Sequence, residues 1–179
     1  MEKLTITEAL SEVNLIKKKV GAKQQKVLGA LVRPAHTKDL YESDGGSKKM
    51  IESEAQAIND LNRRLAKIRS AISDANLSNE ITLGEDTRTI HDWLTWKREI
   101  VNSQIHFTKS VHTTVKNMMD KIAKEPQVYV NEEGKQSLVQ AVPNVDMAYW
   151  VRQEEILNEK LEQLDGKLSL KNATINISL

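Results

Sequence analysis

The sequence predicts a mostly α-helical protein: an elongated antiparallel four-helix bundle of coiled-coil type with one small β-hairpin. Three observations predict this fold class. The 179 residues include only 7 Gly and 3 Pro, so the chain has few turns and its elements must be long. Apolar residues recur at seven-residue intervals in several segments, as they do in coiled coils. Hydrophobic residues make up 39% and charged residues 28%, as in folded proteins, so we expect a single helical domain over residues 1–179.

The first helix is predicted to begin near Thr7 and to end before Pro34. Thr7 can act as the N-cap, and the carboxylate of Glu8 in the first turn suits the helix dipole. Proline disfavours helical geometry in the residue that precedes it. The apolar face of this helix is expected to hold Ile6, Ala9, Leu10, Val13, Ile16, Val20, Val27 and Leu31.

Residues 32–47 are predicted to form a long loop. Turn residues open it at Pro34 and close it at Gly45-Gly46. A loop of about 15 residues is uncommon in a compact domain and is often functional or mobile. The amides that follow the glycine pair could bind an anion, but we favour the simpler interpretation that Ser47 is the N-cap of the second helix.

The second helix has the clearest heptad pattern of the chain. Its apolar rows are Ile51, Ile58, Leu65 and Ile72 beside Leu61, Ile68 and Ala75. A polar connection is expected over residues 76–86.

The third helix is predicted over residues 88–124, with Pro126 marking its end. At 1.5 Å per residue this helix is roughly 55 Å long. A compact globule of this chain length would be only about 40 Å across. We therefore expect an elongated molecule whose apolar seam needs a partner, and hence a homo-oligomer.

The remaining elements are shorter. Alternating apolar residues around a polar turn predict a β-hairpin over residues 127–142. A fourth helix is expected over residues 145–170, and the tail at 172–179 alternates like a short strand.

The composition excludes several kinds of chemistry. Cysteine is absent, which rules out disulfides, thiolate metal sites and a cysteine nucleophile. The four histidines, at positions 36, 91, 106 and 112, lack the spacing of a zinc site. The chain has no phosphate-binding glycine loop and no serine nucleophile elbow. We therefore expect no enzymatic activity, no metal and no cofactor.

Charge and hydropathy indicate the kind of partner. The net charge is only +1, so a nucleic-acid partner is not expected. No stretch approaches 18 consecutive apolar residues, so we expect no membrane span. The start of the chain lacks the pattern of a signal peptide, and we expect a cytoplasmic protein.

Basic side chains are concentrated in two blocks. Residues 1–38 carry a net charge of +5, and residues 61–70 hold four basic side chains and no acidic one. Such blocks usually form solvated faces or complementary seams between helices. The alternative is a phosphate-binding patch. That patch would consist of Lys17, Lys18, Lys19, Arg63, Arg64 and Arg69.

Three tryptophans stand out in a chain with a single phenylalanine. Trp93 and Trp96 are three residues apart, so we expect them to share a helix face with Ile100 and Phe107. A core or subunit-interface position is the expected role of these rings, and the alternative is a platform on which a base stacks.

A polar motif follows the second helix. It comprises Asn76, Asn79, Thr82, Asp86, Arg88 and Thr89. The motif resembles the septicolysin-like family of bacterial and phage helical proteins, as do the opening at residues 8–10, the run at residues 142–146 and Asn172. Thr87 departs from the family pattern, which has Gly there. The resemblance implies a long-helix, coiled-coil-like fold and oligomers, in a family whose biochemical role is unsettled.

Two interpretations of this motif stay open. In the structural one, Asn76 and Asn79 satisfy backbone groups at a helix end, and Asp86 or the next residue caps the third helix. Asp146 then lies in the first turn of the fourth helix and binds Arg88. In the functional one, the polar groups converge on a ligand. The candidate ligand-binding residues are Arg63, Arg64, Asn76, Asn79, Asp86, Arg88, Trp93, Trp96 and Asp146.

Two function classes follow from these observations. The first is a non-catalytic oligomer that sequesters a small anionic molecule, such as a nucleotide immune signal captured by a phage anti-defence protein. The alternative is a structural or adaptor coiled coil that binds another protein.

Overall fold

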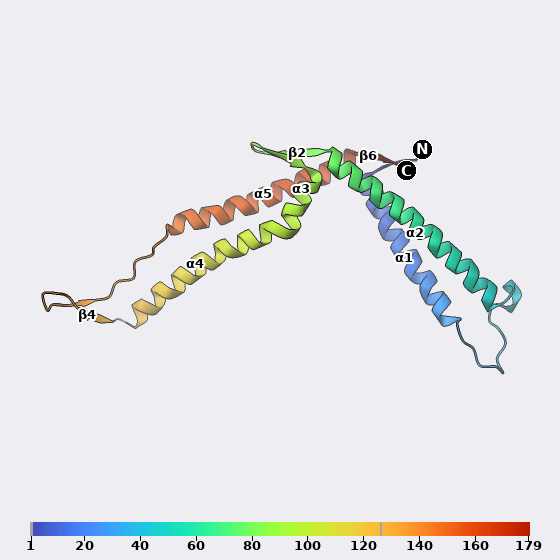
Figure 1. The fold of residues 1–179 in the computed structure, drawn as a ribbon, viewed down its shortest axis with the longest axis horizontal. Helices are drawn as coiled ribbons and strands as arrows, with labels where there is room; N and C mark the ends of the chain where they lie inside the picture. The colour runs from blue at the N-terminus through green and yellow to red at the C-terminus, as the bar shows by residue number, and fades with distance from the viewer. Residues whose placement is uncertain (1, 126) are drawn as a thin grey trace. The chain divides into compact units, whose positions relative to one another are not determined.

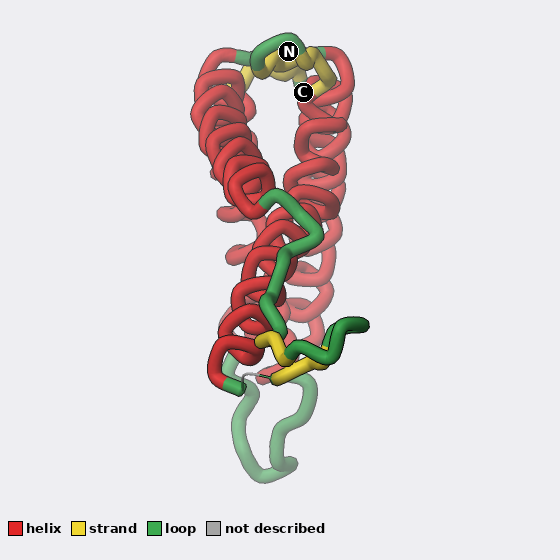
Figure 2. Tube along the Cα trace, turned by 90° about the vertical axis from the view of Figure 1, so that its left-hand side faces the viewer, coloured by secondary structure: helices red, strands yellow, loops and turns green. Residues whose placement is uncertain are grey.

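The fold was analysed in a computed structural model that describes residues 2–125 and 127–179. Most of the chain is helical (Figure 2). The chain divides into two compact units, one formed by residues 2–80 with 168–179 and the other by residues 81–167. We describe each unit by itself.

The first unit is built on a helical hairpin closed at one end by two short strands (Figure 1). Its elements are β1 (Lys3–Thr5), α1 (Ile6–Gly29), α2 (Ser47–Ser78), the last turns of α5 (Met147–Thr174) and β6 (Asn176–Ser178). Strands β1 and β6 pair antiparallel, with Leu4 opposite Ile177. The strand predicted in the tail is therefore present, and its partner β1 was not predicted.

Helix α1 begins at Ile6 rather than near Thr7, because Thr5 is its N-cap. The Thr5 hydroxyl accepts the backbone N–H of Glu8, and the Glu8 carboxylate accepts the backbone N–H of Thr5 at 2.8 Å. This reciprocal capping box fixes the helix start two residues earlier than expected. The helix ends at Gly29, ahead of Pro34 as predicted.

The core of the first unit confirms the predicted apolar faces of α1 and α2. Its buried members are Ile6, Ala9, Val13 and Ile16 from α1, Ile68 and Ile72 from α2, and Ile177 from β6. All come from the predicted rows or from the strand that covers their end. The heptad pattern therefore placed the inward faces of both helices correctly.

The predicted loop lies between α1 and α2 and contains a short 3₁₀ helix, η1 (Glu42–Asp44). Ser47 is not the N-cap of α2, which is Gly46 with a φ of 91°. Asp39 takes that role from a distance: its carboxylate accepts the backbone N–H of Ser47 at 2.8 Å and also the Ser47 hydroxyl. The negative charge at this helix N-terminus is thus a side chain of the protein itself.

The second unit begins with a hairpin that the sequence analysis missed. Strands β2 (Glu80–Leu83) and β3 (Asp86–Thr89) occupy most of the region predicted as a polar connection. The turn has Gly84 at its first central position with a φ of 61°, which a type II′ turn requires. The third helix therefore starts later than predicted.

Helix α3 (Ile90–Thr95) is capped by Thr89, whose hydroxyl accepts the backbone N–H of Asp92 at 3.1 Å. The predicted cap, Asp86, lies at the start of β3 instead. A π-helical segment, η2 (Trp96–Ile100), then leads into α4 (Val101–Lys124), so the predicted third helix is continuous but contains one wide turn. Pro126, the predicted helix end, lies outside the described residues.

The wide turn also corrects the predicted aromatic face. Trp93 and Trp96 are buried, whereas Ile100 and Phe107 are exposed. Within η2 the N–H of Val101 bonds to the carbonyl of Trp96, five residues back, and the extra residue displaces the following side chains around the helix.

The predicted hairpin is present as β4 (Val128–Val130) and β5 (Gln136–Leu138), which pair antiparallel. Helix α5 starts at Met147, two residues later than predicted, and Asp146 accepts the backbone N–H groups of Ala148 and Tyr149. Asp146 is therefore a cap rather than a first-turn residue.

The mostly helical class is confirmed, but the four long helices do not share one core. The core of the first unit contains residues of α1, α2 and β6. Within residues 2–125 and 127–179, no helix combines the length and the apolar character that a membrane span needs.

Candidate functional site

The densest polar constellation lies in the second unit around Asp86. We call it the Asp86 cluster and define it by Asp86, Arg88, Lys160 and Trp93. Arg88 donates to both carboxylate oxygens of Asp86, from Nε to Oδ1 at 2.9 Å and from Nη2 to Oδ2 at 2.8 Å. Lys160 of α5 donates to Oδ2 from the other side, also at 2.9 Å. One carboxylate thus holds two cations and joins β3 to α5.

Both cations also lie over tryptophan rings. The Arg88 guanidinium carbon is 4.8 Å from the Trp93 ring centroid, and the Lys160 ammonium is 4.9 Å from it. Cation–π attraction stabilises such an arrangement and is strongest at Trp. The cluster therefore covers an aromatic ring with paired charges.

Neither Trp93 nor Trp96 is available as a stacking platform in this structure. Trp93 is 0% exposed, and its indole N–H donates to the carbonyl of Ile81 at 2.8 Å. Trp96 is 7% exposed and packs edge to face on Trp93 with ring centroids 5.5 Å apart. The expected core role of these rings agrees with their placement.

The electrostatics of the cluster keep Asp86 ionised. Hydrogen bonds from Arg88, and then from Lys160, hold the pKa of Asp86 below its usual value. An aspartate held in this way accepts hydrogen bonds and is a poor proton donor or acceptor near neutral pH. Two cations on one anion leave the cluster with a net positive charge, so an added anion would find attraction there.

Asn79 and Asn76 of the motif lie at the end of α2. The Asn79 amide donates to the carbonyl of Ala75 at 2.8 Å, which satisfies a free carbonyl at the end of α2, as the structural interpretation predicted. Asn76 lies half-buried on α2 in the same unit. The predicted pairing of Arg88 with Asp146 is wrong, because Arg88 pairs with Asp86, two residues away in the same strand.

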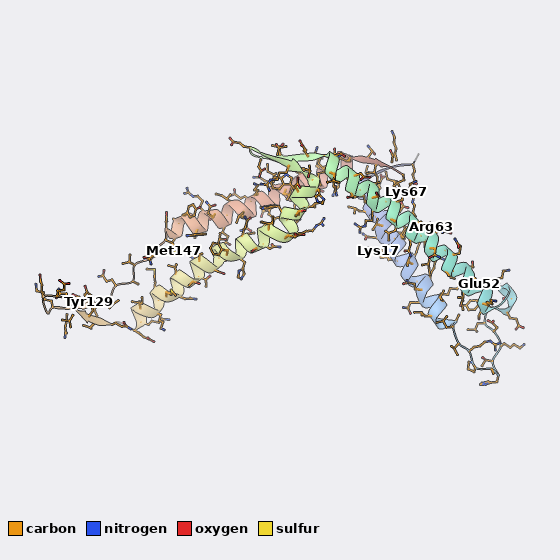
Figure 3. All side chains as sticks on the ribbon, viewed as in Figure 1. Lys17, Glu52, Arg63, Lys67, Tyr129 and Met147 are labelled. Atoms are coloured by element: carbon orange, nitrogen blue, oxygen red, sulfur yellow. The ribbon has the colours of Figure 1, made fainter. Side chains whose placement is uncertain are left out.

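Three basic residues of the first unit, Lys23, Lys26 and Arg64, pair with glutamates across its helical hairpin. Arg64 of α2 donates to Glu12 of α1 at 2.8 Å and to Glu2 at 2.6 Å, and these bonds raise its pKa. Arg63 pairs with Asp60 of its own helix at 3.1 Å. The Arg64–Glu12 pair matches the expected complementary seam between helices, and Arg63 and Arg64 of the alternative phosphate patch are both held in ion pairs. Figure 3 labels Lys17 on α1 and Arg63 on α2.

The described part of the chain has neither a cluster of metal-binding side chains nor an unpaired buried polar side-chain atom. Within residues 2–125 and 127–179, no three His, Asp or Glu side chains gather as a metal site would require. Every buried side-chain nitrogen or oxygen in the same residues has a hydrogen-bond partner. The buried polar groups of this part of the chain are thus accounted for by internal contacts.

An exposed apolar surface lies in the second unit, where the sequence analysis expected only that the third helix would have an apolar seam in need of a partner. Its members are Ile100, Phe107, Met118 and Met119 of α4 and the turn before it, Tyr149 and Ile156 of α5, and Val128, Tyr129, Val130 and Leu138 of the hairpin. Figure 3 labels Tyr129 in this hairpin and Met147 where α5 begins. Exposed apolar patches of this kind mark interaction sites. The heptad pattern of the sequence predicted that the helices have apolar faces. It did not predict which of these faces the rest of the chain would leave exposed.

Comparisons with known proteins bear on the fold. No protein-family model matches the sequence, and no curated protein matches it. The structure is similar to the crystal structure of a functionally unknown conserved protein from Corynebacterium diphtheriae, with a TM-score of 0.61 at 13% sequence identity. The match covers 99% of this chain and 100% of that one. At this identity the likeness shows a shared fold and carries no statement about function.

Proposed function

We propose that this protein is a non-catalytic, homo-oligomeric adaptor that works by binding other protein surfaces along its helices. The observation that carries this proposal is the exposed apolar surface of the second unit. Its large side chains lie on two helices and a hairpin, so they offer an extended surface rather than a pocket for a small molecule. Burying such a surface against protein is favourable at roughly 25 cal/mol per Å².

The polar clusters support the same assignment. The Asp86 cluster and the Arg64 contacts hold segments together within their own units through internal ion pairs. A catalytic site would instead present a titratable group in a cleft with a perturbed pKa suited to proton transfer. The coiled-coil-like bundle expected from the sequence is proposed here to form between copies of the chain.

Native mass spectrometry of freshly purified protein tests this proposal. We expect a dimer or larger oligomer whose mass is an integer multiple of the chain mass of 20.3 kDa. A monomer that carries an additional small-molecule mass would overturn the adaptor assignment and favour a ligand carrier.

A second candidate is sequestration of an anionic small molecule such as a nucleotide, as the resemblance to phage proteins suggests. The observation that favours it is the net positive charge of the Asp86 cluster, in which Arg88 and Lys160 share one carboxylate. Phosphate could draw Arg88 away from Asp86 through charge-assisted hydrogen bonds.

A panel of linear and cyclic nucleotides, titrated while tryptophan fluorescence is recorded, tests the second candidate. Sequestration predicts saturable quenching that weakens at high salt and is lost in Arg88→Ala. Arg63→Ala is the matched control, because Arg63 is exposed and lies in the other unit. Absence of binding by every nucleotide in the panel would remove this candidate.

A further inference from the structure

The outer part of the α4/α5 pair lacks a core. From Lys109 to Gln163, no described side chain is buried: Thr108 is the last buried residue of α4, and Leu164 is the first of α5. An apolar hollow of about 240 Å³ lies at its far end, lined in part by Met118, Ile122 and Val142. Burial of apolar surface is the dominant favourable term in folding, so this segment needs a cover to be stable.

Most of the half-buried and buried positions of the two helices follow a heptad pattern, and we call the positions of this pattern the seam. The seam positions, which alternate in spacings of three and four, are 101, 105, 108, 112, 115, 119 and 122 on α4 and 147, 150, 154, 157, 161 and 164 on α5. Lys109 of α4 and Glu154 of α5 form an ion pair at 3.4 Å, and Phe107 packs edge to face on Trp150 with ring centroids 5.4 Å apart.

One side of this pair carries most of its large exposed apolar side chains, whereas the apolar residues of the other side are Ala123, Ala148 and Val151. Two antiparallel helices are related by a two-fold axis perpendicular to them. Residues that come one position before a seam residue therefore lie on the same side of the pair in both helices, and residues one position after it lie on the other side. The positions one residue before the seam include Phe107, Val111 and Met118 on α4 and Tyr149 and Ile156 on α5. We call these five residues the apolar face. The positions one residue after the seam include Lys109, Lys116, Asp120, Glu155, Asn158 and Glu162, which are polar.

The charges of the two helices are complementary. Helix α4 has four lysines and one aspartate, a net charge of +3. Residues 147–163 of α5 have four glutamates against one arginine and one lysine, a net charge of −2. In an association of two copies, α4 against α4 would repel, whereas α4 against the partner's α5 is attractive.

We propose that the apolar face binds the same face of a second copy around a two-fold axis that runs along the helices. Each α4 then lies opposite the partner's α5, and the four helices form an antiparallel bundle between two chains. This inference rests on the proposed homo-oligomeric function and specifies the surface and the geometry.

The geometry also gives the β4–β5 hairpin a cover. Val128, Val130 and Leu138 are all more than half exposed. A hairpin of two strands is marginally stable on its own in water. With the axis along the helices, both hairpins lie at the same end of the bundle, where each can pack against the other.

Substitution of the apolar face tests the surface. Ile156→Lys should weaken dimerisation at least ten-fold in sedimentation equilibrium, because a lysine replaces an apolar side chain at the interface. Val151→Lys is the matched control: Val151 lies on the same helix with similar exposure, 40% against 45%, but one residue after the seam. Far-UV circular dichroism of both variants checks that the helices are retained, and Met118→Lys on α4 provides a second, independent substitution.

Spin labels test the geometry. The chain has no cysteine, so Glu133→Cys in the hairpin turn gives one labelling site per copy. With both hairpins at one end, the distance between labels should be shorter than α4, which is about 36 Å for 24 residues. A longer distance would overturn the proposed axis.

The outcomes separate this inference from the function on which it rests. A wild-type dimer that both lysine substitutions leave intact would overturn the apolar face as the interface while leaving the oligomeric adaptor in place. A wild-type monomer at micromolar concentration would overturn both.

Discussion

The two helical hairpins of this protein are packed differently. In the α1/α2 hairpin, Ala9, Val13 and Ile68 are fully buried, and strands β1 and β6 cover the end of the core. In the outer α4/α5 pair, no described side chain from residue 109 to residue 163 is buried.

Side-chain size explains part of this difference. Ala9, Ala71 and Ala75 contribute to the α1/α2 core, and small residues let two helices approach closely. The α4/α5 pair instead meets through the large rings of Phe107 and Trp150. A heptad pattern therefore predicts that a helix has an apolar face, but it does not predict whether its own chain covers that face.

The largest effect is expected from a truncation in the well-packed hairpin. Ile68→Ala should lower the free energy of unfolding by roughly 2–5 kcal/mol, because a fully buried side chain leaves a cavity. Leu157→Ala, at a half-buried seam position of α5, should lower the free energy of unfolding by about 1 kcal/mol. This value is to be measured in the Ile156→Lys variant, in which the association of two copies is weakened. Chemical denaturation followed by circular dichroism provides both values. Equal costs would contradict the contrast between the hairpins.

Hydrogen exchange sharpens the comparison without a change to the core. In the Ile156→Lys variant, the backbone amides of residues 109–124 and 147–160 should exchange faster than in the wild type, because the cover has been removed. The amides of α1 should keep their protection. Faster exchange throughout the chain would mean that the substitution unfolds the protein.

A smaller effect is expected at the Asp86 cluster. Arg88→Ala removes one of the two cations that lie over Trp93, so water gains access to the ring and the tryptophan emission should shift to longer wavelength. All three tryptophans belong to the second unit, so this signal reports that unit alone. Arg63→Ala should leave the emission unchanged. An unshifted spectrum in Arg88→Ala would show that Lys160 alone covers the ring.

The smallest effect is local and depends on pH. Hydrogen bonds from Ser47, and then from Tyr41, lower the pKa of Asp39 from 3.8 to about 2. A lowered pKa in the folded state stabilises the loop at pH values above 3.8, and this contribution is lost as the pH falls through about 2.

Amide exchange or nuclear magnetic resonance at Ser47 measures this loss. The first turn of α2 should lose protection between pH 4 and pH 2, and Asp39→Asn should reduce the pH dependence while keeping part of the cap. Protection that does not change over this range would contradict the role given to Asp39.

The sequence predicted what depends on local periodicity and missed what depends on contacts between distant residues. The apolar rows of α1 and α2, the hairpin at residues 127–142 and the short strand in the tail were all predicted. The β2–β3 hairpin was missed because each strand has only four residues, although Leu83-Gly84-Glu85-Asp86 is typical of a two-residue turn.

The candidate site was predicted less well than the fold, for the same reason. Asp86 and Arg88 were both named as candidate residues, and the structure pairs them with each other, but their partner Lys160 is 74 residues from Asp86 and no spacing rule connects them. Asp39 was missed as the cap of α2 because it lies eight residues before Ser47. The predicted partner of Arg88, Asp146, proved to be the cap of α5.

The π-helical segment η2 acts as a register shift within one continuous helix. It holds one residue more than an α-helical turn would need, and each residue of a helix advances its side chain by about 100°. Trp93, before the segment, and Trp96, its first residue, are buried, and Val101, directly after the segment, is buried as well. Removing a single residue from 96–100 would rotate the whole of α4 by that angle relative to α3. Residues next to the present seam residues would then take the seam positions. The length of this short segment therefore determines which face of α4 is inward.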